Sequence, residues 1–222
     1  MTIQYAIRGT GMEKQPYSSE IPKDAQVVQV LTHEEFKEMG APTDNRPIVL
    51  ESIDRALACH VDVFDDCSAG SVSIPDKTDL LTTLFRVGFY LDARRLTFVD
   101  DSETCAKELE IVAEAHLHTP LSLGRVLFLM LEHLISNDAL FLEAFEAKLE
   151  HSEEGIVKMK ELDIDNTILL RLRELLRLNY YYEQLSDIGA LLEENANELL
   201  DSSEARLFGI FSRHSDRLLD RS

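Results

Sequence analysis

The first part of the chain alternates between short runs of β-forming residues and polar connections. Residues 2–8 (TIQYAIR) and 25–31 (AQVVQVL) are rich in β-branched and aromatic side chains, and each predicts a strand. Residues 9–24 contain two glycines, two prolines and many polar residues, and predict a loop between the two strands.

Two helices are expected after the second strand. Thr32 is followed three residues later by Glu35, which is the spacing of a capping box, and Gly40 gives the short helix its stop. Residues 47–58 (PIVLESIDRALA) then place apolar side chains at helical spacing.

More strands are predicted before residue 102. HVDVFD (60–65) and SVSIP (71–75) lie on either side of a Ser-Ala-Gly segment that predicts a small turn. Residues 82–101 form the clearest hairpin pattern, with Asp92-Ala93-Arg94 at its turn. We therefore predict an α+β protein that begins with an N-terminal α/β sheet domain over residues 1–118, although the strand order cannot be derived.

From Ser102 onward the pattern is entirely helical. Ser102 is expected to cap one helix, and Thr119-Pro120 to start another as its N-cap and first residue. No Pro or Gly then interrupts the apolar stripe until Gly155, which predicts about 35 residues of continuous helix, roughly 50 Å long. The stripe consists of Val126, Met130, Leu134, Phe141, Phe145 and Leu149.

A second long helix is predicted from about Thr167 to Glu194. Residues 155–166 are short enough for a turn, so the two long helices should form an antiparallel, coiled-coil-like hairpin over residues 119–197. The apolar positions of the second helix are Leu172, Leu175, Leu176, Tyr182, Leu185 and Ile188.

A third helix is predicted in residues 198–222, and it has no stop signal. Phe208, Phe211, Leu218 and Leu219 lie on one helix face, and neither Gly nor Pro follows them. Either the helix frays at Ser222, or a longer helix has been cut there.

The charge balance limits the partners. There are 41 Asp and Glu residues against 22 Lys and Arg, a formal net charge of −19. Such a surface repels nucleic acid and anionic lipid headgroups and attracts cations, although acidic surfaces also serve solubility alone. Three cysteines indicate a reducing compartment. The sequence shows no signal peptide and no run long enough to span a membrane, so we expect this piece to be soluble.

The densest group of possible metal ligands lies in residues 59–67. Strand alternation would place its members on opposite faces, and the group lacks the CxxC pairs of a structural zinc site. An edge strand with a solvated face is therefore favoured over a metal site. The group comprises Cys59, His60, Asp62, Asp65, Asp66 and Cys67.

Three other features raise questions of chemistry. His116 and His118 have a chelating spacing, but at a helix end they more simply complement the free carbonyl groups. Asp138 interrupts an apolar stripe and needs a partner. Tyr180–Tyr182 cannot share one helix face, which favours an interface. The expected partner of Asp138 is an arginine of the second long helix: Arg171, Arg173 or Arg177.

Catalytic motifs are absent from the sequence. It contains no nucleophile elbow, no phosphate-binding glycine loop and no HExxH sequence. We therefore expect no catalytic residues, no tightly bound cofactor and no enzymatic activity.

Three helical segments resemble the cytoplasmic helices of CorA-type magnesium and divalent cation channels. They are FLMLEHLISNDALFLEAFEAKLEHSEE (128–154), LLRLRELLRLNYYYEQLSDIGALLEEN (169–195) and SSEARLFGIFSRHSDRLLDRS (202–222). The resemblance covers roughly residues 100–222, and the family's Gly-Met-Asn motif is absent. In that family an α/β domain precedes two long acidic helices and a stalk helix that enters the membrane.

The resemblance implies a cytoplasmic regulatory domain of a homopentameric divalent cation channel, with Mg²⁺ as the expected ion. Membrane helices would follow the stalk over residues 198–222, whose face of Phe208, Phe211 and Leu218 would meet neighbouring subunits. The family senses ions at acidic sites between subunits, but residues 208–211 are apolar here, and the metal ligands stay unknown.

Two alternatives stay open. One is a stand-alone, soluble coiled-coil protein that binds a partner, and the other is a metal-dependent enzyme that uses the group at residues 59–67.

Overall fold

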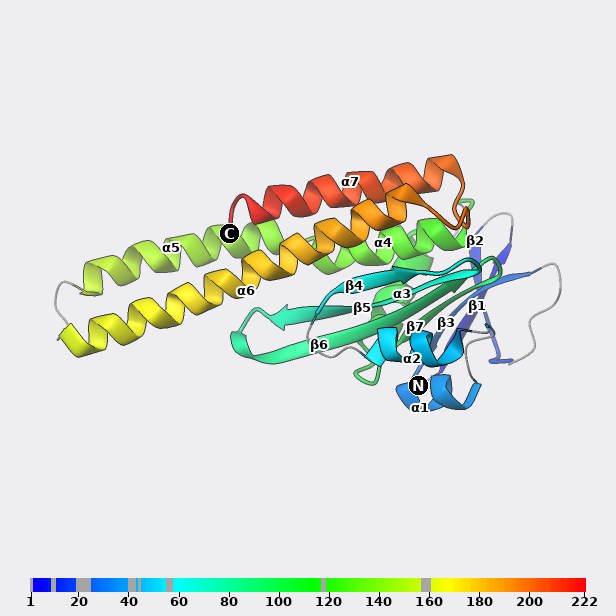
Figure 1. The fold of residues 1–222 in the computed structure, drawn as a ribbon, viewed down its shortest axis with the longest axis horizontal. Helices are drawn as coiled ribbons and strands as arrows, with labels where there is room; N and C mark the ends of the chain where they lie inside the picture. Colours follow the sequence, from blue (N-terminus) through cyan, green and yellow to red (C-terminus); the bar gives the residue numbers. More distant parts are fainter. Residues whose placement is uncertain are drawn as a thin grey trace.

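The computed structural model contains one mixed sheet with helices on both of its faces (Figure 1). Its long helices extend beyond the sheet at one end. The structure describes residues 2–8, 11–18, 25–39, 43, 45–54, 58–116, 119–156 and 161–222, and the side chains of residues 83 and 150–165 are not part of that description.

Within the described residues, the sheet has seven strands in the order β2-β1-β3-β7-β6-β5-β4. β3 and β7 pair in parallel, and every other pair is antiparallel. The strands are β1 (Ile3–Arg8), β2 (Gly11–Gln15), β3 (Gln26–Leu31), β4 (His60–Val63), β5 (Cys67–Asp76), β6 (Asp79–Asp92) and β7 (Arg95–Val99).

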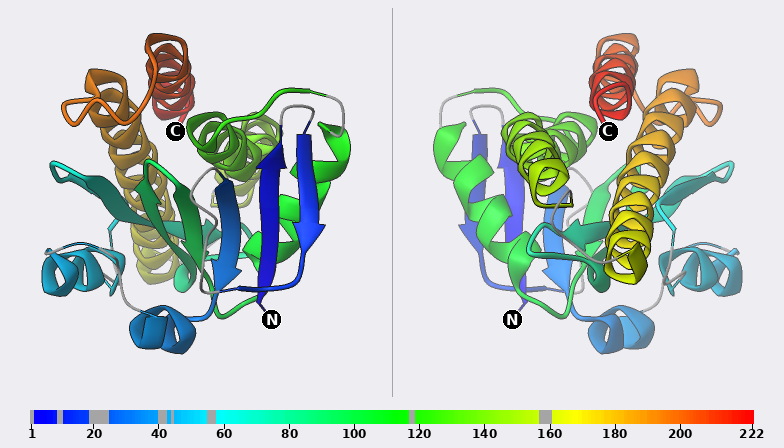
Figure 2. Two further views of the ribbon diagram at one scale, coloured as in Figure 1. Left: turned by 90° about the vertical axis from the view of Figure 1, so that its right-hand side faces the viewer. Right: turned by 90° about the vertical axis from the view of Figure 1, so that its left-hand side faces the viewer.

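The helices form unequal layers (Figure 2). α1 and α2 cover one face of the sheet, α3, α4 and α6 cover the other, and α7 packs on α4 and α6 away from the sheet. The helices are α1 (His33–Met39), α2 (Arg46–Asp54), α3 (Thr104–Ala115), α4 (Leu123–Ile135), α5 (Asp138–Ile156), α6 (Glu161–Glu194) and α7 (Ser202–Leu219).

Strand alternation supplies two apolar cores. Phe89 and Leu91 of β6 enter the larger core, which joins the sheet to α3, α4, α6 and α7. Tyr90, between them, points to the other face, where it packs with Phe36 of α1. The larger core contains residues from both sides of the predicted domain boundaries after residues 118 and 197. The division into these domains stays a prediction.

Most of the predicted N-terminal pattern is confirmed. The strands at 2–8 and 25–31, the hairpin at 82–101 and the helix over most of 47–58 are present. The capping box is confirmed as well, because the Glu35 amide donates to the Thr32 hydroxyl (3.2 Å) while the Thr32 amide donates to the Glu35 carboxylate (2.8 Å). Gly40 and residues 55–57 lie outside the described residues.

Two predictions for the sheet are wrong. The expected loop at 9–24 contains β2, a polar edge strand paired with β1. The expected turn at 68–70 lies inside β5 instead. Gly70 is there because β4 passes closely: a Cβ on it would lie 2.2 Å from the His60 carbonyl oxygen.

The long helix predicted from residue 120 is broken. α4 and α5 are separated by a turn at Ser136-Asn137, where the Ser136 hydroxyl donates to the His133 carbonyl (2.9 Å) and competes with the helical ladder. α4 begins after Ser122, whose hydroxyl caps it, rather than at Thr119. The hydroxyl groups of Ser122 and Ser136 therefore set the start and the end of α4, and the apolar stripe indicated neither.

The other predicted helices are present, with changed ends. The turn was expected at residues 155–166, but α5 includes residues 155–156, and α6, which is 34 residues long, includes residues 161–166. Residues 157–160 lie outside the described part. Ser102 does not cap α3 as predicted, because the Cys105 amide in its first turn donates to the Asp100 carboxylate instead (2.8 Å). Within the described ranges after residue 102 there is no strand.

The apolar face of α7 is buried within the chain, contrary to the expectation that it would meet other subunits. Phe208, Phe211 and Leu218 are 0%, 0% and 2% exposed, packed among α4 and α6. α7 folds back along α6 and is capped at its start by Asp201 and Glu204. Across the described residues, no helix combines the length and apolar character needed to cross a membrane.

Candidate functional site

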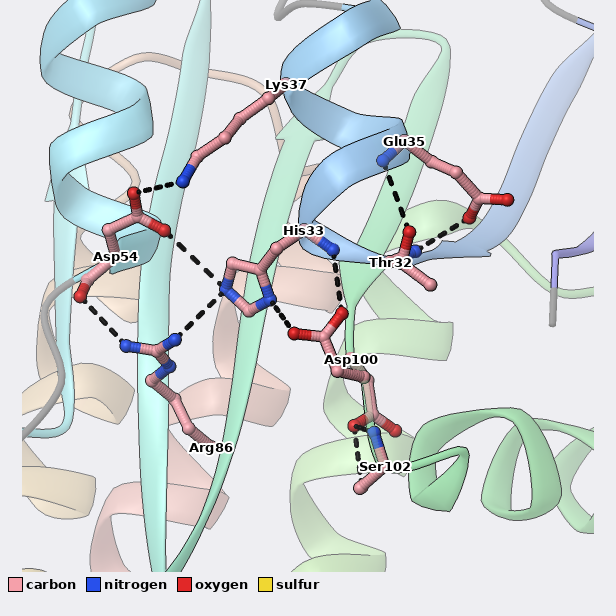
Figure 3. A network of polar contacts seen from close by, with 9 residues as sticks. Thr32, His33, Glu35, Lys37, Asp54, Arg86, Asp100 and Ser102 are labelled. Atoms are coloured by element: carbon pink, nitrogen blue, oxygen red, sulfur yellow. Dashed lines mark hydrogen bonds and ion pairs between the residues drawn. The ribbon is translucent and has the colours of Figure 1, made fainter.

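A polar network lies at the carboxyl ends of the parallel strands β3 and β7 (Figure 3). His33 follows β3, and Asp101 follows β7. The Asp101 carboxylate accepts from the His33 amide (3.0 Å) and contacts His33 Nδ1 (3.0 Å). Open α/β sheets often bind ligands at such an edge.

The remaining contacts show that the network ties the fold together. Lys37 of α1 pairs with Asp54 of α2 (3.0 Å), and the Arg86 guanidinium of β6 donates to the Asp54 carbonyl (3.0 Å). His33 Nε2 lies 3.7 Å from the Asp54 carboxylate. The Arg86 guanidinium also lies 3.4 Å from His33 Nε2. These contacts join α1 and α2 to the sheet.

The group of possible metal ligands at residues 59–67 is dispersed. Cys59 is buried against Ser73, whose amide donates to its sulfur (3.2 Å), and burial raises the pKa of the Cys59 thiol to about 12. His60 contacts the Ser52 hydroxyl (3.1 Å) and Asp62 (3.8 Å).

The other members of that cluster point elsewhere. Asp65 and Asp66 are exposed in the turn between β4 and β5, and Cys67 is buried in the smaller core. Within the described ranges, no three His, Cys, Asp or Glu side chains gather closely enough to hold a metal ion.

His116 lies at the end of α3. Its Nδ1 contacts the Val112 carbonyl oxygen (2.9 Å), one of the carbonyl groups left free at the helix end. This confirms the helix-end interpretation for His116, whereas His118 lies outside the described residues.

Asp138 has a different partner from the one predicted. It is 1% exposed at the start of α5, pairs with Lys77 from the β5–β6 turn, and accepts a hydrogen bond from the Tyr182 hydroxyl of α6 (3.0 Å). The predicted arginine pairing is wrong: Arg171 pairs with Glu174 (2.7 Å), and Arg177 donates to the Leu81 carbonyl (3.3 Å).

The Asp138 contacts make a junction between three parts of the fold. The sheet hairpin, the start of α5 and the middle of α6 meet at one carboxylate. Burial, and then the charge of Asp138, raise the pKa of the Tyr182 hydroxyl well above its usual range, so Tyr182 stays a donor. Asp138 was recognisable in the sequence as an acid within an apolar stripe, but no sequence feature indicated Lys77 as its partner.

The tyrosine run splits as its spacing requires. Tyr181 and Tyr182 are buried, and Tyr180 is 64% exposed, which confirms that the three cannot share one face.

α6 carries the connection from the sheet to α7. It packs on β4, β5 and β6 along one side and on α7 along another. Gly189 permits the close approach, since a Cβ there would lie 2.8 Å from the Ser212 amide nitrogen. His214 of α7 also contacts Glu132 of α4 (3.0 Å). A displacement of α7 would therefore also change its contacts with α4 and α6.

A groove of about 440 Å³ opens between the β5–β6 hairpin and α6. Its walls are apolar, with arginines and amide groups at the edges. No motif in the sequence indicated this groove. The lining includes Leu84, Arg173, Leu176, Arg177, Tyr180 and Gln184.

Comparison with known proteins relates this arrangement to others. No protein-family model and no curated protein matches the chain. Solved structures do match over its whole length. The soluble domain of CorA from Methanocaldococcus jannaschii has a TM-score of 0.71 at 16% identity, and the match covers 100% of this chain and 90% of that one. The chain has the CorA soluble-domain fold.

Two further structures share this CorA soluble-domain fold. The ZntB cytoplasmic domain from Vibrio parahaemolyticus RIMD 2210633 has a TM-score of 0.74 at 12% identity, and the match covers 99% of this chain and 89% of that one. The full-length CmaX protein has a TM-score of 0.75 at 12% identity, with 99% and 71% covered. At these identities the likeness establishes the fold, including the long hairpin and α7.

Proposed function

We propose that this chain is the cytoplasmic domain of a divalent cation transporter, with Mg²⁺ as the carried ion, and that it works as a homo-oligomer. One observation carries the proposal: CorA and ZntB domains match the chain over 99–100% of its length, α7 included. One CorA protein of this fold is described as a magnesium transporter. The proposal assigns the chain no catalytic role.

The physical basis is a path from the domain to α7. In the proposal the sheet domain (1–118) and the helical hairpin (119–197) hold α7 in place. Residues 198–222 connect it to a membrane part, so that a movement of α7 moves that part as well. The formal charge of −19 raises the local concentration of divalent cations, which prefer oxygen ligands such as carboxylates. We assign no ligand set.

The test is cation flux by the complete protein. The full gene product is placed in liposomes that contain an indicator for Mg²⁺, Zn²⁺ or Na⁺, and uptake of each ion is compared with uptake by empty liposomes that contain the same indicator. We expect divalent uptake that exceeds the leak, with Mg²⁺ carried. Equal signals in protein-containing and empty liposomes would contradict the proposal.

A second candidate function is a soluble interaction protein. It is favoured by the exposed apolar side chains of α6, among them Leu172 and Leu176, which are 49% and 58% exposed. A complete gene product that inserts into no membrane would support this function and overturn the first.

A further inference from the structure

The outward face of α6 changes character along the helix. In the first half the exposed side chains are largely apolar: Leu172 and Leu176 are 49% and 58% exposed, and Tyr180, just beyond this half, is 64% exposed. In the second half acidic side chains such as Glu183 and Asp187 are exposed. An exposed apolar stripe on one half of a helix indicates a contact that the single chain does not make.

The stretch of α6 that carries these exposed side chains, residues 167–182, is positively charged within an acidic protein. Residues 167–182 contain three arginines and one glutamate, in a chain whose net charge is −19. Arg171 is engaged with Glu174. Arg173, at the edge of the groove, is exposed and has no ion pair or hydrogen bond among the described residues. This patch therefore suits an occupant that combines acidic and apolar groups.

The shape of the patch favours a polypeptide over a membrane. The arginines and Leu176 border a hollow against Leu84 of β6, and a hollow receives a protruding side chain better than it lies on a flat bilayer. The overall negative charge also opposes approach to anionic lipid.

Another copy of this chain carries a complementary face on α3. Ile111 is 50% exposed there, and the exposed Glu114 lies one turn further along the helix, beside Glu110. α3 and α6 lie at opposite sides of the molecule, as both views of Figure 2 show. Every copy can therefore use both faces at once in a head-to-tail contact.

We propose that the groove between α6 and β6 of one copy receives the Ile111–Glu114 face of α3 from a second copy. Ile111 enters the apolar groove beside Leu176, and Glu114 pairs with Arg173. The proposal rests on the homo-oligomer part of the proposed function and adds the surfaces through which copies meet. It leaves the number of copies open.

The experiment measures association of the purified chain by sedimentation velocity over a wide range of protein concentration. Arg173→Glu and Glu114→Arg should each weaken association about tenfold or more, because each places like charges together. The double variant should restore most of the loss. Lys107→Glu, which replaces an exposed cation one turn before Ile111 by an acid, should strengthen association.

Controls separate this contact from net charge and from other occupants. Arg206→Glu on the exposed side of α7 changes the net charge as Arg173→Glu does, and should have a clearly smaller effect. Thermal unfolding should show that all variants keep the fold.

Several results would overturn the proposal. They are a chain that stays monomeric at every concentration, association that Arg173→Glu leaves unchanged, or a double variant no better than the single ones. Arg173-dependent sedimentation with phosphatidylserine–phosphatidylcholine vesicles would instead assign the patch to a membrane. None of these results bears on cation flux by the complete protein, so the two proposals fail separately.

Discussion

The two halves of α6 have the same helical geometry and different surroundings. From Leu178 to Leu192, side chains at helical spacing are buried between the sheet and α7. From Ile168 to Leu176, five large apolar side chains are 45–58% exposed. Both halves are rich in leucine, so apolar content alone does not distinguish the half that holds the fold from the half that is left free.

The difference shows what the neighbouring elements contribute. The second half lies over β4, β5 and β6 and under α7, whereas the first half extends past the sheet, beside α5 (Figure 1). Because burial supplies the stabilisation, the same residue type should matter greatly in one half and little in the other.

Leucine truncation gives the largest expected contrast. Leu185→Ala should lower the free energy of unfolding by about 3 kcal/mol, because Leu185 is 1% exposed and its removal leaves a cavity. Leu176→Ala should change it by less than about 0.5 kcal/mol. Urea unfolding of both variants measures the contrast, and equal losses would show that the first half is packed as tightly as the second.

Glycine substitution tests the contact of the second half with α7. A Cβ at Gly189 would lie 2.8 Å from the Ser212 amide nitrogen and 2.9 Å from the Phe208 carbonyl oxygen, so Gly189→Ala should cost about 2–3 kcal/mol.

Gly209 provides the matched control for that substitution. The three atoms nearest to a Cβ there all belong to the carboxylate of Glu193, an exposed side chain that can turn away. Gly209→Ala should therefore leave the unfolding midpoint nearly unchanged. A small effect at Gly189 would mean that α6 and α7 can separate without loss.

Substitution of Asp138 tests the contact between the start of α5 and the middle of α6. Asp138→Ala leaves the buried Tyr182 hydroxyl without its acceptor, while Lys77 can turn to solvent, so we expect a loss of about 2 kcal/mol. Glu146→Ala, an exposed acid on the same helix, should cost less than about 0.5 kcal/mol. Urea midpoints compare them, and similar values would mean that the Asp138 contacts contribute nothing net.

The smallest effect is expected at the groove. Arg173→Ala should change the free energy of unfolding by less than about 0.5 kcal/mol, because Arg173 is exposed and unpaired within the described structure. Thermal unfolding at low protein concentration measures this. A loss of more than about 1 kcal/mol would assign Arg173 to the fold rather than to a contact.

Much of the fold follows from local patterns. The strands at 25–31 and 82–101 and the Thr32 capping box depend on neighbouring residues in the sequence, and they were predicted. β2 and the break at Ser136 were missed for a physical reason: a polar edge strand has no apolar alternation, and a hydroxyl that competes for a carbonyl leaves the apolar stripe intact.

The candidate site was less predictable than the fold. Asp138 could be identified as a buried acid, but its partner Lys77 lies 61 positions earlier in the chain, in a turn whose place depends on the whole sheet. The burial of Phe208 and Phe211 could not be predicted either, because it requires that α7 fold back along α6. Long-range pairing of this kind is a property of the assembled sheet and helices.

Hydrogen–deuterium exchange along α6, measured at low and at high concentration of the purified chain, tests the central claim most directly. The account predicts that amides of residues 181–192 exchange slowly at both concentrations, because opening them requires separation of the sheet and α7. Amides of residues 167–177 should exchange faster at low concentration and slow down as copies associate. Uniform exchange along α6, or no dependence on concentration in residues 167–177, would contradict the division of α6 into a half that holds the fold and a half that receives another copy.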